Sequence, residues 1–95
     1  MLEQEPGDLF LNYALGLEYA KDLQSVADAE AQFKIVLDIN KDYIAAYYQL
    51  GQLFEKTERP EEALQFYQEG LTLARTQKNN KAINEFSEAI FLLED

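Results

Sequence analysis

The chain has 95 residues, with 18 acidic and 8 basic side chains and a formal net charge of −10 at pH 7. This length allows one small domain or a short stack of repeats. The acidic balance argues against binding to nucleic acid or to an anionic membrane, because both need clustered Lys and Arg. The sequence contains no Cys, His or Trp. Disulfides, thiolate or His-based catalysis, and zinc sites of the usual ligand types are therefore excluded.

The first residues, 1–7, lack the basic stretch and the apolar run of a secretory signal. The longest apolar stretch, residues 43–48, is far shorter than the roughly 20 residues that a membrane span needs. On these grounds we expect a cytoplasmic protein without a membrane partner.

Local signals predict five helices. Asp8 can cap the first of them, and the pair Ser25 and Asp28 resembles a capping box for the second. Asp42 can open the third helix. We place the first three helices at about residues 8–21, 26–39 and 42–57.

The last two helices have clear start signals. Pro60 suits the first turn of the fourth helix, where Glu61 and Glu62 face its positive end. Asn79 or Asn80 then caps the fifth helix. These two helices are predicted at about residues 60–77 and 80–93.

The chain also repeats itself. Residues 12–19 align with residues 47–54 at an offset of 35, with an identical Leu-Gly pair and an aromatic residue three positions later in both copies. Ala29 and Phe33 align with Ala63 and Tyr67 at an offset of 34. A period of about 34 residues, built from two helices, is typical of helical-repeat proteins.

These residues resemble the tetratricopeptide repeat pattern W-x2-L-G-x2-Y…A-x3-F…P, with Asn12 in place of the usual large aromatic in the first copy. The resemblance implies an all-α fold, an α-α superhelix of five antiparallel helices. It also implies a single domain over residues 1–95, with repeat one at about 8–41, repeat two at about 42–77 and a capping helix at about 80–93.

The paired Leu-Gly motif predicts a close contact between helices. Glycine inside a helix costs about 1 kcal/mol relative to alanine, so its presence at the same position of both copies indicates a packing reason. We expect the facing helix to cross close to Gly16 and Gly51, with Ala29 and Ala63 as small counterparts. Large residues beside the contact are expected to be core: Leu15, Tyr19 and Phe33 in the first copy, and Leu50, Phe54 and Tyr67 in the second.

The resemblance also implies a binding surface, because the first helix of each repeat in this family lines a concave groove that binds extended peptides. Tyr13 and Tyr48 occupy equivalent places in the two copies. The groove residues implied here are Phe10, Tyr13, Leu17, Tyr48, Gln52, Asn84 and Glu88. The alternative is that these aromatic side chains only fill space between helices.

The implied function is that of a protein–protein interaction module, a scaffold or adaptor. The family's carboxylate clamp needs Lys and Asn in the groove, whereas the clamp positions here hold Tyr13, Leu17, Tyr48 and Gln52. The acidic balance instead favours a basic or mixed-charge peptide partner. We expect no catalytic residue, cofactor or metal, and hence no enzyme, because Ser25 and Ser87 have no His to activate them.

Self-association is the alternative function. Two repeats and a cap are fewer units than such arrays generally need for stability, so a second chain could complete the fold as a homodimer. The candidate surfaces are Phe10 with Leu11, and Phe91 with Leu92. For Phe91 and Leu92 the sequence leaves three places open: the end of the core, a groove, or another chain.

Overall fold

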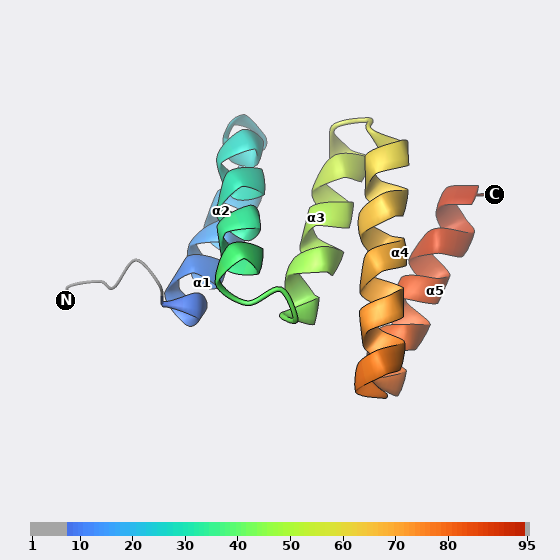
Figure 1. Ribbon diagram of the computed structural model, residues 1–95. Coiled ribbons are helices and arrows are strands. Elements are labelled where there is room, and N and C mark those ends of the chain that lie inside the picture. The colour runs from blue at the N-terminus through green and yellow to red at the C-terminus, as the bar shows by residue number, and fades with distance from the viewer. Residues whose placement is uncertain (1–7, 95) are drawn as a thin grey trace. The chain divides into compact units, whose positions relative to one another are not determined.

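The computed structural model describes residues 8–94, which form five α-helices, a short 3-10 helix and no strand. The helices are α1 (Leu9–Ala20), η1 (Leu23–Ser25), α2 (Val26–Ile39), α3 (Ile44–Lys56), α4 (Pro60–Gln77) and α5 (Asn80–Glu94). Each predicted helix is present, and every boundary lies within two residues of the predicted one (Figure 1). No helix in this part of the chain is long and apolar enough to cross a membrane.

The helix ends explain why the boundaries were predictable. The Asp8 carboxylate accepts a hydrogen bond from the Leu11 backbone N–H at 3.0 Å, and the Asn79 side chain accepts one from the Ala82 N–H at 3.1 Å. Pro60 is the first residue of α4 and is followed by Glu61 and Glu62, as predicted. Of the two candidates for the start of α5, Asn79 is therefore the capping residue.

The capping box predicted for Ser25 is not formed. Ser25 stands at the N-cap position of α2, as predicted, but its side chain makes no capping hydrogen bond. The chain enters α2 through η1, and the turn before η1 is closed by Asp22, whose carboxylate accepts from the Gln24 N–H at 3.0 Å. The 3-10 turn thus replaces the predicted capping box.

The chain divides into two compact units with a boundary after Ala46. In the first unit, α1 packs against α2 through Gly16, where an added Cβ would lie 2.6 Å from Cε1 of Phe33. The nearest atoms to this glycine all belong to the Phe33 ring, not to Ala29 as we expected. The glycine is needed because a buried aromatic ring approaches the helix backbone too closely for a Cβ atom to fit.

The second unit contains the same contact twice. An added Cβ on Gly51 would overlap the ring of Tyr67, and one on Gly70 would overlap the ring of Phe86. Ala63, the expected counterpart of Gly51, is fully buried but is not the nearest neighbour. Gly70 and Phe86 extend the pattern to α4 and α5, so α5 docks on α4 through the same ring-on-glycine contact.

Two residues of the repeated motif differ in burial. Leu50 is 0% exposed, as predicted for a core residue, whereas its counterpart Leu15 is 42% exposed. The prediction for Leu15 is therefore wrong. Because α1 is the first helix that the structure describes, no earlier helix of that part of the chain covers this face.

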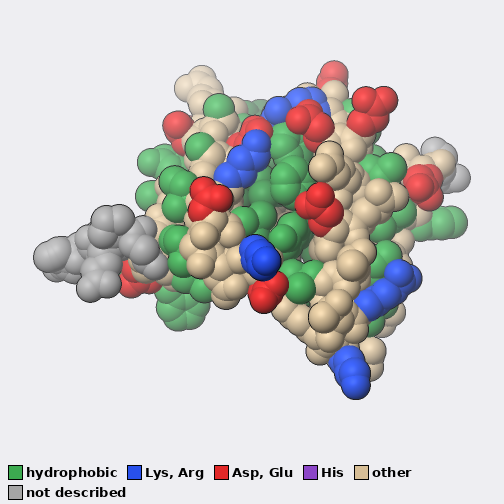
Figure 2. Space-filling view, in the orientation of Figure 1, with side chains coloured by type: hydrophobic (Ala, Val, Ile, Leu, Met, Phe, Trp, Pro, Cys, Tyr) green, Lys and Arg blue, Asp and Glu red, His purple; other side chains and the backbone are tan. Residues whose placement is uncertain are grey.

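Hydrophobic side chains also reach the surface elsewhere. Figure 2 shows them on the visible face among dispersed acidic and basic side chains. Phe91 and Leu92 of α5 are 68% and 65% exposed, so they do not pack into the end of the core.

Candidate functional site

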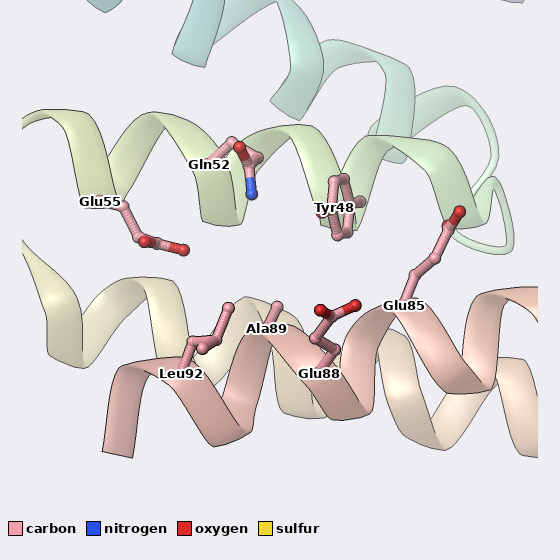
Figure 3. Close-up of a pocket in the computed structure, with 7 residues that line it drawn as sticks. All are labelled: Tyr48, Gln52, Glu55, Glu85, Glu88, Ala89 and Leu92. Carbon is pink, nitrogen blue, oxygen red and sulfur yellow. The ribbon is translucent and has the colours of Figure 1, made fainter. Parts of the chain in front are cut away.

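A pocket of about 240 Å³ lies between α3 and α5 in the second unit. On α3, Tyr48, Gln52 and Glu55 recur at the spacing that places side chains on one face of a helix. They point toward α5, whose side chains point back across the pocket (Figure 3). The α5 side of the pocket is lined by Glu85, Glu88, Ala89 and Leu92.

A hydrogen-bond relay through Tyr67 positions two of the polar side chains. The Gln52 amide Nε2 donates to the Tyr67 hydroxyl at 2.8 Å, and this hydroxyl donates to Oε2 of Glu55 at 2.5 Å. Tyr67 is fully buried, so its ring cannot move with the solvent-facing groups. Burial and the hydrogen bond to Glu55 raise the pKa of the Tyr67 phenol, which remains a donor to the carboxylate.

The Tyr48 ring forms the aromatic wall of the pocket. It packs against Phe86 at 5.7 Å between ring centroids, edge to face, and against Tyr67 at 5.8 Å. Burial raises the pKa of the Tyr48 phenol above its ordinary value, and the charges of Glu85, Glu55 and Glu88 raise it further. The neutral phenol is therefore favoured at the wall, beside a negative potential.

The residues that line the pocket include three carboxylates and neither Lys nor Arg. Glu55, Glu85 and Glu88 are all exposed, as expected for ionised side chains on helix surfaces. In residues 8–94, no three carboxylates converge closely enough to hold a metal ion. The pocket offers hydrogen-bond acceptors spread along two helices, an aromatic wall formed by Tyr48 and an apolar edge formed by Ala89 and Leu92.

Three of the predicted groove residues meet at this pocket: Tyr48, Gln52 and Glu88. Asn84 is exposed on α5, one turn before Glu88, and is not part of the lining. The role of these residues in binding stays a prediction.

The other predicted groove residues belong to the first unit. Phe10 is 76% exposed at the start of α1, and Leu17 is half-buried. Tyr13 packs against Phe33 at 5.6 Å and against Tyr43 at 5.1 Å between ring centroids. Tyr13 therefore also has the space-filling role that we gave as the alternative.

Sequence reasoning missed three lining residues, Glu55, Glu85 and Ala89, whereas a groove was one of the three places left open for Leu92. The signal for Glu55 was present, because it follows Tyr48 by seven positions and so falls on the same helical face. The same spacing relates Glu85 to Leu92. Tyr67 was predicted only as a core aromatic residue, since nothing in the local sequence indicates which residues its hydroxyl meets.

Comparisons with known proteins agree with the helical-repeat fold. A model of the tetratricopeptide repeat matches residues 44–77. A solution NMR structure of a tetratricopeptide repeat domain protein from Salinibacter ruber is 32% identical, with a TM-score of 0.86, over 96% of this chain and 91% of that one. A crystal structure of such a protein from the same organism is 32% identical, with a TM-score of 0.82, over 92% and 97%. A search of curated proteins finds no significant match.

Proposed function

Because this chain belongs to the tetratricopeptide repeat family, with the α-α superhelix fold class of that family, we propose that it is a scaffold or adaptor that binds a peptide or partner helix on its groove surface. Proteins of this family generally act as protein–protein interaction modules. The observation that supports the proposal is the pocket between α3 and α5, which brings together the predicted residues Tyr48, Gln52 and Glu88.

The pocket suits recognition better than catalysis. Its aromatic wall and its hydrogen-bonding groups provide contact area and orientation, which are the features of interface cores. The described residues offer it no nucleophile with an activating base, since the chain has no His and no Cys. We therefore propose a non-enzymatic role in the cytoplasm.

A partner retained from host lysate and identified by mass spectrometry provides the test. Replacing Tyr13 or Tyr48 by alanine would remove ring contacts from each unit, so loss of binding would be ambiguous. Glu88→Ala together with Asn84→Ala changes two exposed side chains and is preferable. We expect this variant to weaken capture of the identified partner, while Ser87→Ala on the same helix leaves capture unchanged. Full capture by the double variant would contradict the proposal.

A second candidate, self-association, is favoured by one observation. Phe10 and Leu11 of α1 are 76% and 47% exposed, so a short apolar strip of this helix is open to a partner. A symmetric homodimer through α1 would cover it. Sedimentation equilibrium of the purified chain distinguishes the two functions: a monomer at high micromolar concentration removes this candidate, whereas a dimer that Phe10→Ser dissociates supports it.

A further inference from the structure

The pocket between α3 and α5 combines negative charge with apolar surface. Acidic groups alone would attract any cation and would define no ligand. Here the Tyr48 ring and the 65% exposed Leu92 side chain lie beside Glu55, Glu85 and Glu88. A ligand that satisfies both surfaces needs a cationic head and an apolar stem.

We propose that this pocket receives an arginine side chain of the bound peptide, an inference that rests on the peptide-binding function proposed above. The methylene stem lies along Leu92 and Ala89, and the guanidinium lies between the two helices against the Tyr48 ring. Charge complementarity selects this occupant, because the lining contains three carboxylates and no cation.

Arginine fits the acceptors better than lysine. The carboxylates come from both helices, as Figure 3 shows, so one cation must donate in several directions. A guanidinium has five N–H donors in a planar fork and binds carboxylates in pairs, whereas an ammonium is a compact and strongly hydrated charge. A planar guanidinium also packs on aromatic rings, as Arg59 already does on Phe54 at 4.4 Å within this unit.

Two existing interactions compete only weakly with such a ligand. Lys81 lies 4.0 Å from Glu85, but its side chain is 87% exposed, so this ion pair is largely screened by water. Glu55 receives the Tyr67 hydroxyl, yet a carboxylate accepts about four hydrogen bonds and keeps sites for a guanidinium. The relay through Tyr67 thus orients Glu55 without saturating it.

Three capped tripeptides that differ only in the central residue test the proposal: acetyl-Gly-Arg-Gly-amide, its lysine counterpart and its citrulline counterpart. Citrulline keeps the shape of arginine and removes the charge. Each is titrated into the ¹⁵N-labelled full chain at low ionic strength, with backbone amide shifts as the readout. We expect the arginine peptide to shift the amides of Gln52, Glu88 and Ala89, and the citrulline peptide to bind at least about fivefold more weakly.

Matched charge variants locate the interaction. Glu85→Gln with Glu88→Gln removes two carboxylates from the pocket and should weaken the arginine peptide about fivefold. Glu58→Gln with Glu69→Gln removes two exposed carboxylates of the same unit that do not line the pocket, and should leave binding unchanged. Circular dichroism verifies that both variants keep their helices.

Each contrary result has a defined meaning. Equal binding of arginine and citrulline overturns recognition of charge, and equal binding of arginine and lysine overturns selection of the guanidinium. If both charge variants weaken binding of the arginine peptide equally, the peptide is attracted by the overall negative charge of the chain. This result also contradicts the proposed arginine site. The peptide-binding function is still tested separately by any of these results. The variant Asn84→Ala with Glu88→Ala is measured by capture of an identified partner, and that test does not require the partner to contain arginine.

Discussion

The first unit, with α1, α2 and the start of α3, and the second unit, with the rest of α3, α4 and α5, use the same packing contact to different extents. In the first, the Phe33 ring lies on Gly16. In the second, Tyr67 lies on Gly51 and Phe86 lies on Gly70, so α4 takes part in both contacts. The apolar face of α1 stays exposed at Leu15, whereas the equivalent Leu50 is fully buried. The comparison teaches that the shared Leu-Gly motif gives the same ring-on-glycine contact in both units but does not by itself bury its leucine.

Removing the ring in each unit tests this comparison most strongly. Phe33 and Phe86 are 0% and 2% exposed, and replacing a buried Phe by Ala typically costs about 3–5 kcal/mol of unfolding free energy. We expect Phe33→Ala and Phe86→Ala to fall in this range in urea denaturation followed by circular dichroism. Phe91→Ala, at a 68% exposed position of α5, is the control and should change stability by less than about 0.5 kcal/mol. If Phe86→Ala behaved like this control, α5 would not be docked through Gly70.

Replacing the motif glycine by a larger residue is expected to have the next largest effect on the free energy of unfolding. A side chain at Gly51 must displace the Tyr67 ring, which is fully buried and cannot swing into solvent. We expect Gly51→Leu and Gly16→Leu each to destabilise the chain by roughly 1–3 kcal/mol, even though leucine is the better helix former. Gln68→Leu, at an exposed position of α4, controls for an added surface leucine. An unchanged denaturation midpoint for Gly51→Leu would contradict the close contact.

Removing helix-capping side chains is expected to have a smaller effect on stability, and it compares the two units at their helix ends. Asp8→Ala in the first unit and Asn79→Ala in the second each remove an observed side-chain acceptor, which costs about 1 kcal/mol. Ser25→Ala should cost less than about 0.5 kcal/mol, because the Ser25 side chain makes no capping hydrogen bond. Thermal denaturation of the three variants under one set of conditions measures the difference. A loss for Ser25→Ala equal to that for Asp8→Ala would restore the predicted capping box.

The smallest expected effect is a pH dependence that originates in the second unit. Because the folded pKa of Tyr67 is raised above 10.0, the unfolded chain releases this proton first. The stabilising contribution is therefore complete well below pH 10 and is lost progressively as the pH rises through 10 and above. Tyr67→Phe should reduce the alkaline slope of unfolding free energy. An identical slope in wild type and variant would contradict the raised pKa of Tyr67, which arises first from its burial and then from its hydrogen bond to Glu55.

The helices were predictable because their signals are local. Asp8, Pro60 and Asn79 act on backbone groups within three residues of themselves, so their effect needs no knowledge of the rest of the fold. The repeated Leu-Gly pair likewise indicated a close helix contact. The residue opposite the glycine was predicted wrongly, because spacing along the chain does not say whether Ala29 or Phe33 lies nearest to Gly16.

The site was predictable only in part. Helical spacing placed Tyr48 and Gln52 on one face of α3, and Glu88 on α5. It did not reveal the relay from Gln52 through Tyr67 to Glu55, because those groups come from two helices and meet only after α4 has packed against α3. Contacts of this kind depend on the rotation of each helix about its axis.

The length, the acidic charge and the missing residue types excluded several kinds of site from the start, and the local start signals together with the repeated motif predicted five helices in their observed order. Only the tertiary structure decided where that negative charge matters. It gathers Glu55, Glu85 and Glu88 beside Tyr48 at one pocket, and it leaves Leu15 exposed while burying Leu50. The physical reason is that charge and motif are properties of the chain, whereas burial and electrostatic potential depend on which helix faces come together.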